Sequence, residues 1–96
     1  MTVAAAPSLS ETAMDSLPLE AVHPFDARGV ARRFRHAAIF GALDALAPGE
    51  TMRFINDHDP LPLLRQMAER YGETVEVAYR HRSEQGVVID ILRLDL

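Results

Sequence analysis

Apolar residues recur every three or four positions in two segments of the chain, the spacing of a buried stripe on a helix. The first segment, residues 33–46, carries the stripe Ile39, Phe40, Leu43 and Leu46. The second begins after Pro60 and carries the stripe Leu61, Leu64, Met67 or Ala68, and Tyr71. Helix-stopping residues follow each segment, Pro48-Gly49 after the first and Gly72 after the second. The sequence therefore predicts two helices.

Shorter stretches with strand character lie around these helices. They span residues 22–27, 51–56, 74–81 and 87–94, and Glu84-Gln85-Gly86 predicts a turn between the last two. The predicted order is β-α-β-α-β-β. Two helices cover only one face of a four-stranded sheet, so we expect an α/β fold, a two-layer sandwich with a mixed sheet whose other face is open.

The first part of the chain lacks such a pattern. Residues 1–20 are small and polar, and we expect a flexible N-terminal tail before a domain that spans residues 21–96. The apolar patch Leu17-Pro18-Leu19 leaves open whether this tail docks on the domain.

Composition excludes several classes of function. The 96 residues include no cysteine, which rules out thiol nucleophiles, cysteine-ligated zinc and iron–sulfur clusters. The net charge of −4 argues against general nucleic-acid binding. No apolar run approaches the roughly 20 residues that span a bilayer, and no signal peptide is evident. We expect a cytoplasmic protein without membrane contact.

Four residues that can bind a metal are expected at one edge of the sheet. In a right-handed β-α-β unit, each helix begins where the preceding strand ends, and ligands usually bind at that edge. This places His36 near His58, Asp57 and Asp59, a set that suits a divalent transition metal such as zinc or non-haem iron. The structural alternative is that His36 belongs to the apolar stripe and that Asp57 or Asp59 caps the second helix, with Pro60 at its start.

A cluster of arginines is predicted near the start of the first helix. Backbone N–H groups at a helix N-terminus favour anions, and guanidinium groups strengthen that preference. A phosphate, a carboxylate or an acidic partner would suit such a site; the alternative is a solvated basic face balanced by Asp26. The cluster consists of Arg28, Arg32, Arg33 and Arg35.

The last strand has apolar residues on both of its faces. Ile89 and Ile91 point one way, and Val88, Leu92 and Leu94 point the other, interrupted by Asp90. One set must face away from the helices. An apolar open face would bind a protein partner, a second copy in a homo-oligomer, or the N-terminal tail. Pairing along the edge of the hairpin is an equal alternative.

Several motifs resemble the TusA/SirA layout. They are Asp26-Ala27-Arg28-Gly29-Val30, then a helix, Pro48-Gly49-Glu50-Thr51, a strand, and Asn56-Asp57-His58-Asp59-Pro60. The resemblance covers residues 21–94 and implies a fold like that of the C-terminal domain of translation initiation factor three. The Cys-Pro motif of that layout falls on Arg32-Arg33. Persulfide relay requires a thiolate, so we expect no sulfurtransferase activity.

The chain is more similar to an uncharacterised bacterial TusA-like family. Members read Arg-His-x-x-Ile-Phe in the first helix and Asn-Asp-His-Asp-Pro before the second, as do residues 35–40 and 56–60. Some are fused to hemerythrin-like domains, which implies metal, oxygen or nitrogen-oxide physiology by association only.

Three functions remain open at this point. The favoured one is a non-catalytic binding or regulatory module with a metal- or anion-binding edge near His36 and His58. The second is an enzyme in which one of these histidines acts as general base on a small anionic substrate. The third is an interaction domain that uses its open sheet face. No catalytic residue is assigned, because the sequence contains no nucleophile in an evident setting, no Gly-rich phosphate loop and no readable pair of acids.

Overall fold

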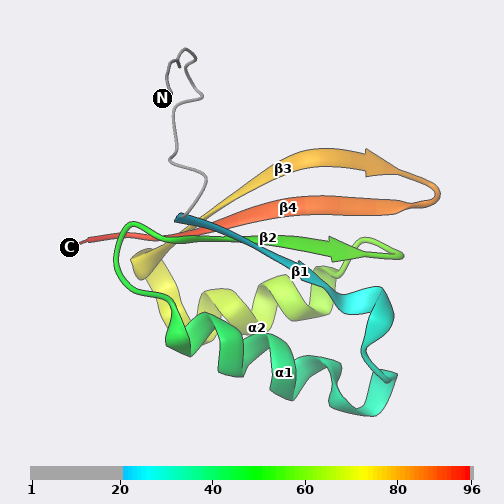
Figure 1. Cartoon of the computed structure of the whole chain (residues 1–96), viewed down its shortest axis with the longest axis horizontal. Coiled ribbons are helices and arrows are strands. Elements are labelled where there is room, and N and C mark those ends of the chain that lie inside the picture. Colours follow the sequence, from blue (N-terminus) through cyan, green and yellow to red (C-terminus); the bar gives the residue numbers. More distant parts are fainter. Residues whose placement is uncertain (1–20, 96) are drawn as a thin grey trace, which may run out of the picture.

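The computed structural model describes residues 21–95, and they form a two-layer α/β sandwich (Figure 1). Both helices lie against one face of a four-stranded mixed sheet, which confirms the predicted fold class. The proposed tail and its Leu17-Pro18-Leu19 patch lie outside the described residues. The elements are β1 (Val22–Asp26), α1 (Arg32–Ala45), β2 (Thr51–Asn56), α2 (Leu61–Tyr71), β3 (Val75–Ser83) and β4 (Gly86–Arg93).

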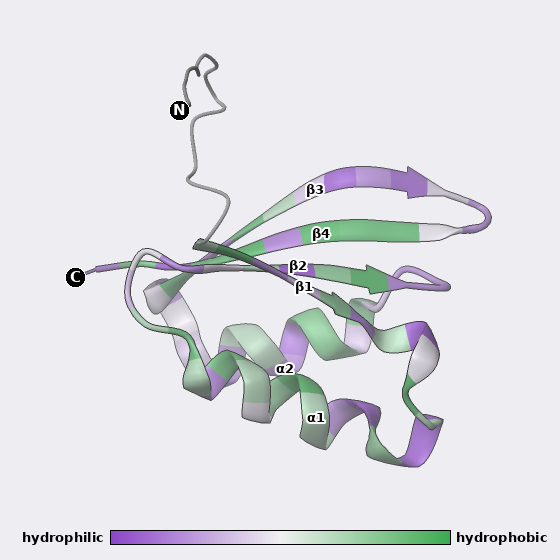
Figure 2. Cartoon of the chain, in the orientation of Figure 1, coloured by the Kyte–Doolittle hydropathy of each residue, from purple (hydrophilic) through white to green (hydrophobic). Residues whose placement is uncertain are grey.

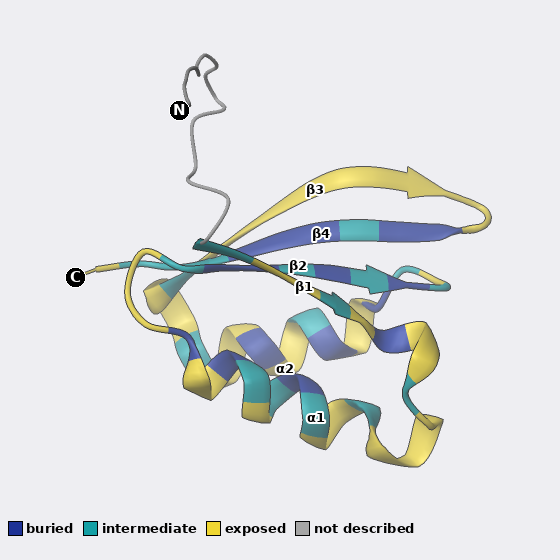
Figure 3. Ribbon diagram, in the orientation of Figure 1, coloured by how far each residue is buried: buried dark blue, intermediate teal, exposed yellow. Residues whose placement is uncertain are grey.

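The strands lie in the order β1-β2-β4-β3, with β1 parallel to β2 and the other pairs antiparallel. The last strand in the chain is therefore an inner strand, and it is mostly buried (Figure 3). By contrast, β3 is exposed along nearly all its length. The core lies between the sheet and the helices and is built from Ile39, Leu43, Met52, Phe54, Leu63, Met67, Val87, Ile89 and Ile91.

The two apolar sets of β4 separate as expected. Ile89 and Ile91 are fully buried in the core, and Val88 and Leu92 lie on the other face, where they are only partly exposed. The prediction of an apolar open face is only partly right, because its centre is ionic. Asp90 accepts hydrogen bonds of 2.9 Å from both Arg53 Nε and Arg53 Nη2, and one of 2.7 Å from Arg80 Nε. Hydropathy colouring shows this polar interruption in β4 (Figure 2).

The two helices are tied together near their C-terminal ends. Asp44 of α1 accepts a hydrogen bond of 2.8 Å from Arg70 and one of 2.7 Å from the Tyr71 hydroxyl, both in α2. Gly72 ends α2 with a φ of 58°, a conformation that favours glycine. Among the described residues, no side-chain hydrogen bond or ion pair joins the N-terminal ends of the two helices, and a cavity lies between them. None of the described helices is long and apolar enough to cross a membrane.

Candidate functional site

A cavity of about 180 Å³ lies between the N-terminal ends of α1 and α2. Its volume is below the roughly 300–1,000 Å³ of pockets for drug-sized ligands, so it suits a small molecule or ion. Apolar side chains from both helices and β2 form part of its wall, and basic and polar side chains form the rest. The lining residues are Arg32, Arg35, His36, Ile39, Phe54, Asn56, His58, Pro60, Pro62 and Leu63.

Within residues 21–95, no side-chain cap hydrogen bond forms at the start of either helix. Ala31 and Pro60 occupy the two N-cap positions, and neither helix has an acidic residue in its first turn. The expectation that Asp57 or Asp59 caps α2 is wrong, because both carboxylates bind other partners. The first N–H groups of a helix have no acceptor within the helix, and they carry partial positive charge. Among the described residues of α1, the amides of Arg32 and Arg33 remain free, because the Phe34 N–H donates to the Ala31 carbonyl. In α2 only Leu63 supplies a free first-turn amide, because the Leu61 N–H donates to the Asp59 carbonyl and Pro62 has no N–H. Two helix N-termini therefore meet at one cavity.

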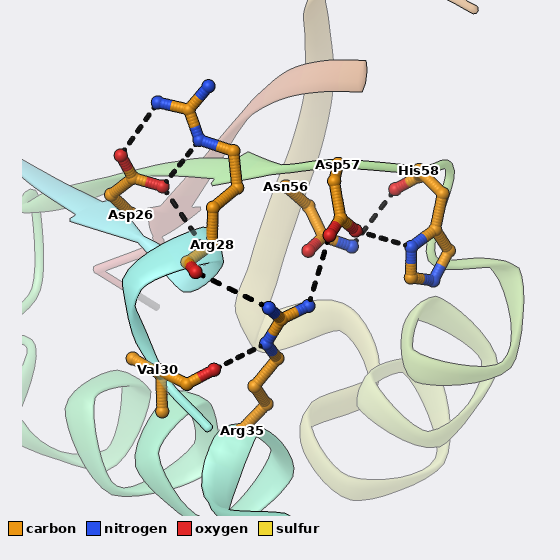
Figure 4. Close-up of polar contacts among 7 residues, drawn as sticks. All are labelled: Asp26, Arg28, Val30, Arg35, Asn56, Asp57 and His58. Atoms are coloured by element: carbon orange, nitrogen blue, oxygen red, sulfur yellow. Dashed lines mark hydrogen bonds and ion pairs between the residues drawn. The ribbon is translucent and has the colours of Figure 1, made fainter. Parts of the chain in front are cut away.

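Arg35 links the segments that surround the site (Figure 4). Its side chain is 13% exposed, and its Nε donates a 2.7 Å hydrogen bond to the Val30 carbonyl. A second nitrogen, Nη2, lies 3.5 Å from the Arg28 carbonyl, and Nη1 lies 3.6 Å from Asp57 Oδ2. Arg35 thus fixes the chain before α1 against the chain after β2.

Only one of the other three arginines of the predicted cluster lies beside Arg35. Arg28 makes a bidentate pair with Asp26, with distances of 2.8 Å and 2.7 Å. This hydrogen bonding from Arg28 holds the pKa of Asp26 below its ordinary value. Arg33 stacks on Phe34, with its guanidinium carbon 4.9 Å from the ring centroid. Only Arg32 joins Arg35 on the cavity wall, and it has no ion pair within residues 21–95.

His58 is oriented by its neighbour Asp57. His58 Nδ1 lies 2.6 Å from Asp57 Oδ1, which leaves Nε2 as the remaining ring nitrogen (Figure 4). Hydrogen bonding to His58 holds the pKa of Asp57 below its ordinary value, and the charges of Arg35 and Arg32 lower it further. Asp57 is therefore a carboxylate at neutral pH and stabilises cations beside it.

Asn56 contributes a buried polar group that the sequence prediction did not single out. It is 5% exposed and donates a 2.9 Å hydrogen bond from Nδ2 to the His58 carbonyl. Its Oδ1 is buried and has no hydrogen-bond partner among the described residues. Buried acceptors are rarely left unpaired, so this one is suited to a donor on a ligand or a water. The only sequence feature that pointed to Asn56 as a site residue was its place at the end of a predicted strand, next to Asp57.

Asp59 is directed away from the cavity. Its carboxylate accepts a 2.6 Å hydrogen bond from the Tyr79 hydroxyl and lies 2.6 Å from Arg82 Nη2, both on β3. Hydrogen bonding to Asp59 also raises the pKa of Tyr79.

Across residues 21–95, no three His, Asp or Glu side chains are grouped so as to hold a metal ion. His36 and His58 share the cavity wall, but the four expected metal ligands are not assembled as one set.

Comparison with known proteins gives a family match. No curated protein and no solved structure matches this sequence significantly. A family of conserved proteins, described as "Uncharacterized conserved protein (DUF2249)", matches residues 24–93. This match extends from β1 to the end of β4, so it includes every element that forms the cavity. The chain therefore belongs to the DUF2249 family.

Proposed function

We propose that this domain is a non-catalytic binding module of the TusA-like superfamily, and that it holds a small anion in the cavity between α1 and α2. The observation that carries the proposal is the convergence of two uncapped helix N-termini with Arg32 and Arg35. Helix N-termini and guanidinium groups both favour negative charge. Asp57 offsets one of the two arginine charges, which leaves the site net positive.

The proposed ligand also carries a hydrogen-bond donor. The unpaired Oδ1 of Asn56 accepts a donor and repels a bare oxyanion. Inorganic phosphate near neutral pH retains a hydroxyl, whereas sulfate does not. We therefore expect phosphate to bind more tightly than sulfate. The chain has no cysteine, so the proposal excludes a persulfide as cargo.

Isothermal titration calorimetry with phosphate tests this function. Arg32→Ala should weaken phosphate binding about tenfold or more, because a charge-assisted hydrogen bond is lost. Arg33→Ala is the matched control, since Arg33 stacks on Phe34 and does not line the cavity. We expect Arg33→Ala to change the phosphate affinity less than about twofold, because an exposed charge outside the cavity contributes little. Absent phosphate binding, or equal losses in both variants, would contradict the proposal.

A zinc titration separates this proposal from a metal site. Zinc held by His36 and His58 would bind metal-free protein without phosphate, and His36→Ala would abolish that binding. The anion proposal expects phosphate binding to survive treatment with a chelator. Zinc binding without phosphate binding would show that the cavity is a metal site and would contradict the anion proposal.

A second candidate is an enzyme that uses the same cavity. The 2.6 Å contact between His58 and Asp57 favours it, because a carboxylate that orients a histidine is typical of a general base. Turnover of a small phosphate or carboxylate ester, lost in His58→Gln, would support this candidate over simple binding.

A further inference from the structure

The outer edge of β3 is open for pairing. β3 lies at one end of the sheet and pairs with β4 alone. Eight of its nine residues are exposed. An edge strand presents a row of N–H and C=O groups that can pair with another strand. Within the described part of the chain, nothing pairs with this edge.

The opposite edge of the sheet is protected. β1 has five residues, with Pro24 at its centre. Proline removes a backbone N–H, and natural sheets use it to block edge pairing. β3 is longer and contains no proline, and its pairing with β4 is regular from Val75 to Tyr79, before a bulge at Arg80. The two edges therefore differ, and β3 is the one suited to strand addition.

The side chains of β3 form an apolar side and a polar side. Val77 and Tyr79 pair in register with Ile91 and Ile89, so they lie on the helix-facing side of the sheet. They remain 41% and 38% exposed, although their partners are fully buried. The helices thus leave this part of β3 uncovered, as the exposed colouring of the strand shows (Figure 3).

The polar side carries an unbalanced charge. Asp90 is bound by both Arg53 and Arg80, so this group of three has one positive charge in excess. Glu76 lies on the same face, since it pairs with Leu92, two positions from Asp90. Among residues 21–95 Glu76 makes no ion pair. β3 therefore presents one free acid and one excess cation on the same face.

We propose that two copies of this chain pair antiparallel through their β3 edges, about a two-fold axis at Ala78. This register brings Glu76 beside Arg80 of the second copy, twice by symmetry, and neutralises the excess charge. Arg80 is the extra residue at the bulge of β3, so its side chain, rather than a directly opposed backbone position, reaches Glu76. It also places Val77 opposite Tyr79 of the second copy on the helix-facing side. Opposite charges and aromatic–aliphatic pairs stabilise directly opposed positions in a sheet. The partner is thus a second copy, and the product is a continuous eight-stranded sheet.

Neighbouring registers do not bring Glu76 and Arg80 of the two copies together. An axis at Glu76 or at Arg80 places that residue opposite itself, which opposes like charges. An axis at Val77 leaves Glu76 opposite Ala78. An axis at Tyr79 leaves Arg80 opposite Ala78 and sets Glu76 against Arg82, but Arg82 lies on the other face of the sheet and already pairs with Asp59. The charges of the strand therefore select Ala78 as the centre.

Cysteine cross-linking tests the register, since the chain has no cysteine of its own. In Ala78→Cys the two new thiols would face each other, with Cα atoms about 4.5–5.5 Å apart, within disulfide reach. Mild oxidation should give a disulfide-linked dimer. In Glu76→Cys the thiols would lie about 13 Å apart along the strands and should not cross-link. Ala37→Cys, on exposed α1, is the control for random collision. Cross-linking of Ala78→Cys no faster than that of the controls would overturn the proposal.

Analytical ultracentrifugation tests the dimer without a cross-link. The unmodified chain should sediment as a dimer of 10.7 kDa protomers. Glu76→Arg should raise the dissociation constant at least about tenfold, because each new arginine would face Arg80 of the second copy. Glu84→Arg, an equal charge change in the hairpin turn, should leave it unchanged. A monomeric unmodified chain at NMR concentrations would refute the dimer and leave the anion site untouched.

Discussion

Gly86 connects the hairpin to the candidate site. Its φ of 151° is one that residues with side chains rarely adopt, and a Cβ there would overlap the Asn56 carbonyl oxygen. The start of β4 therefore packs directly against the residue that ends β2. Asn56 lies on the cavity wall, so the close approach at Gly86 helps to hold that wall in place.

Two glycine substitutions should have opposite effects on stability. Gly86→Ala should lower the free energy of unfolding by about 2 kcal/mol or more, because the new methyl group forces the backbone apart. Gly41→Ala lies within α1, where a Cβ meets nothing within 4 Å. It should raise stability by about 0.5–1 kcal/mol, because alanine favours helix. Urea denaturation measures both. If Gly86→Ala left the free energy of unfolding unchanged, the close approach of residue 86 to the Asn56 carbonyl oxygen would be contradicted.

The residue scale is also where prediction from sequence was weakest. Four arginines close together in the chain predicted one anion cluster, yet only Arg32 and Arg35 line the cavity. Arg28 turns to Asp26 two residues earlier, and Arg33 stacks on Phe34. Neighbours along a helix point in different directions, so spacing alone could not separate these roles.

At the scale of elements, an ionic group joins three strands. Arg53 on β2 and Arg80 on β3 both bind Asp90 on β4. Burial alone would raise the pKa of Asp90, but the hydrogen bonds from the two arginines more than offset it and hold the pKa below its ordinary value. A carboxyl group with a depressed pKa stabilises the fold only while it is ionised.

The stability that Asp90 contributes should depend on pH. A depressed folded-state pKa gives stability that is present above the unfolded value of about 3.9 and is lost as pH falls through the folded value. Asp90→Asn should therefore cost about 1–3 kcal/mol at pH 7 and progressively less below about pH 4. Urea denaturation across this range measures the difference. Exposed Asp95→Asn is the control, and a pH-independent cost for Asp90→Asn would contradict the ionic role.

Helices and strands were predictable because their apolar residues follow the periods of three to four and of two. The start of α2 next to Pro60 was also predicted correctly, but the expected aspartate cap was wrong. Tyr79 and Arg82, some 20 residues later, bind Asp59 instead. A local motif cannot reveal a competing partner on a distant strand.

At the scale of the whole molecule, topology creates the candidate site. β1 and β2 are parallel, so both end at the same edge of the sheet, and α1 and α2 both begin there. The chain order alone predicted this shared edge, and both His36 and His58 line the cavity at it. The shape of the cavity and the unpaired acceptor of Asn56 were not predictable, because both depend on side-chain packing.

The central claim is that both helix N-termini contribute to one anion site. Two-dimensional ¹H–¹⁵N NMR during a phosphate titration tests it most directly, because backbone N–H groups at a bound anion change their chemical shifts. We predict saturable shifts at the first-turn amides of α1 and α2, including Arg32 and Leu63, and no shift at the tip of the β3–β4 hairpin. No saturable shift, or shifts confined to one helix or to the hairpin, would contradict the account.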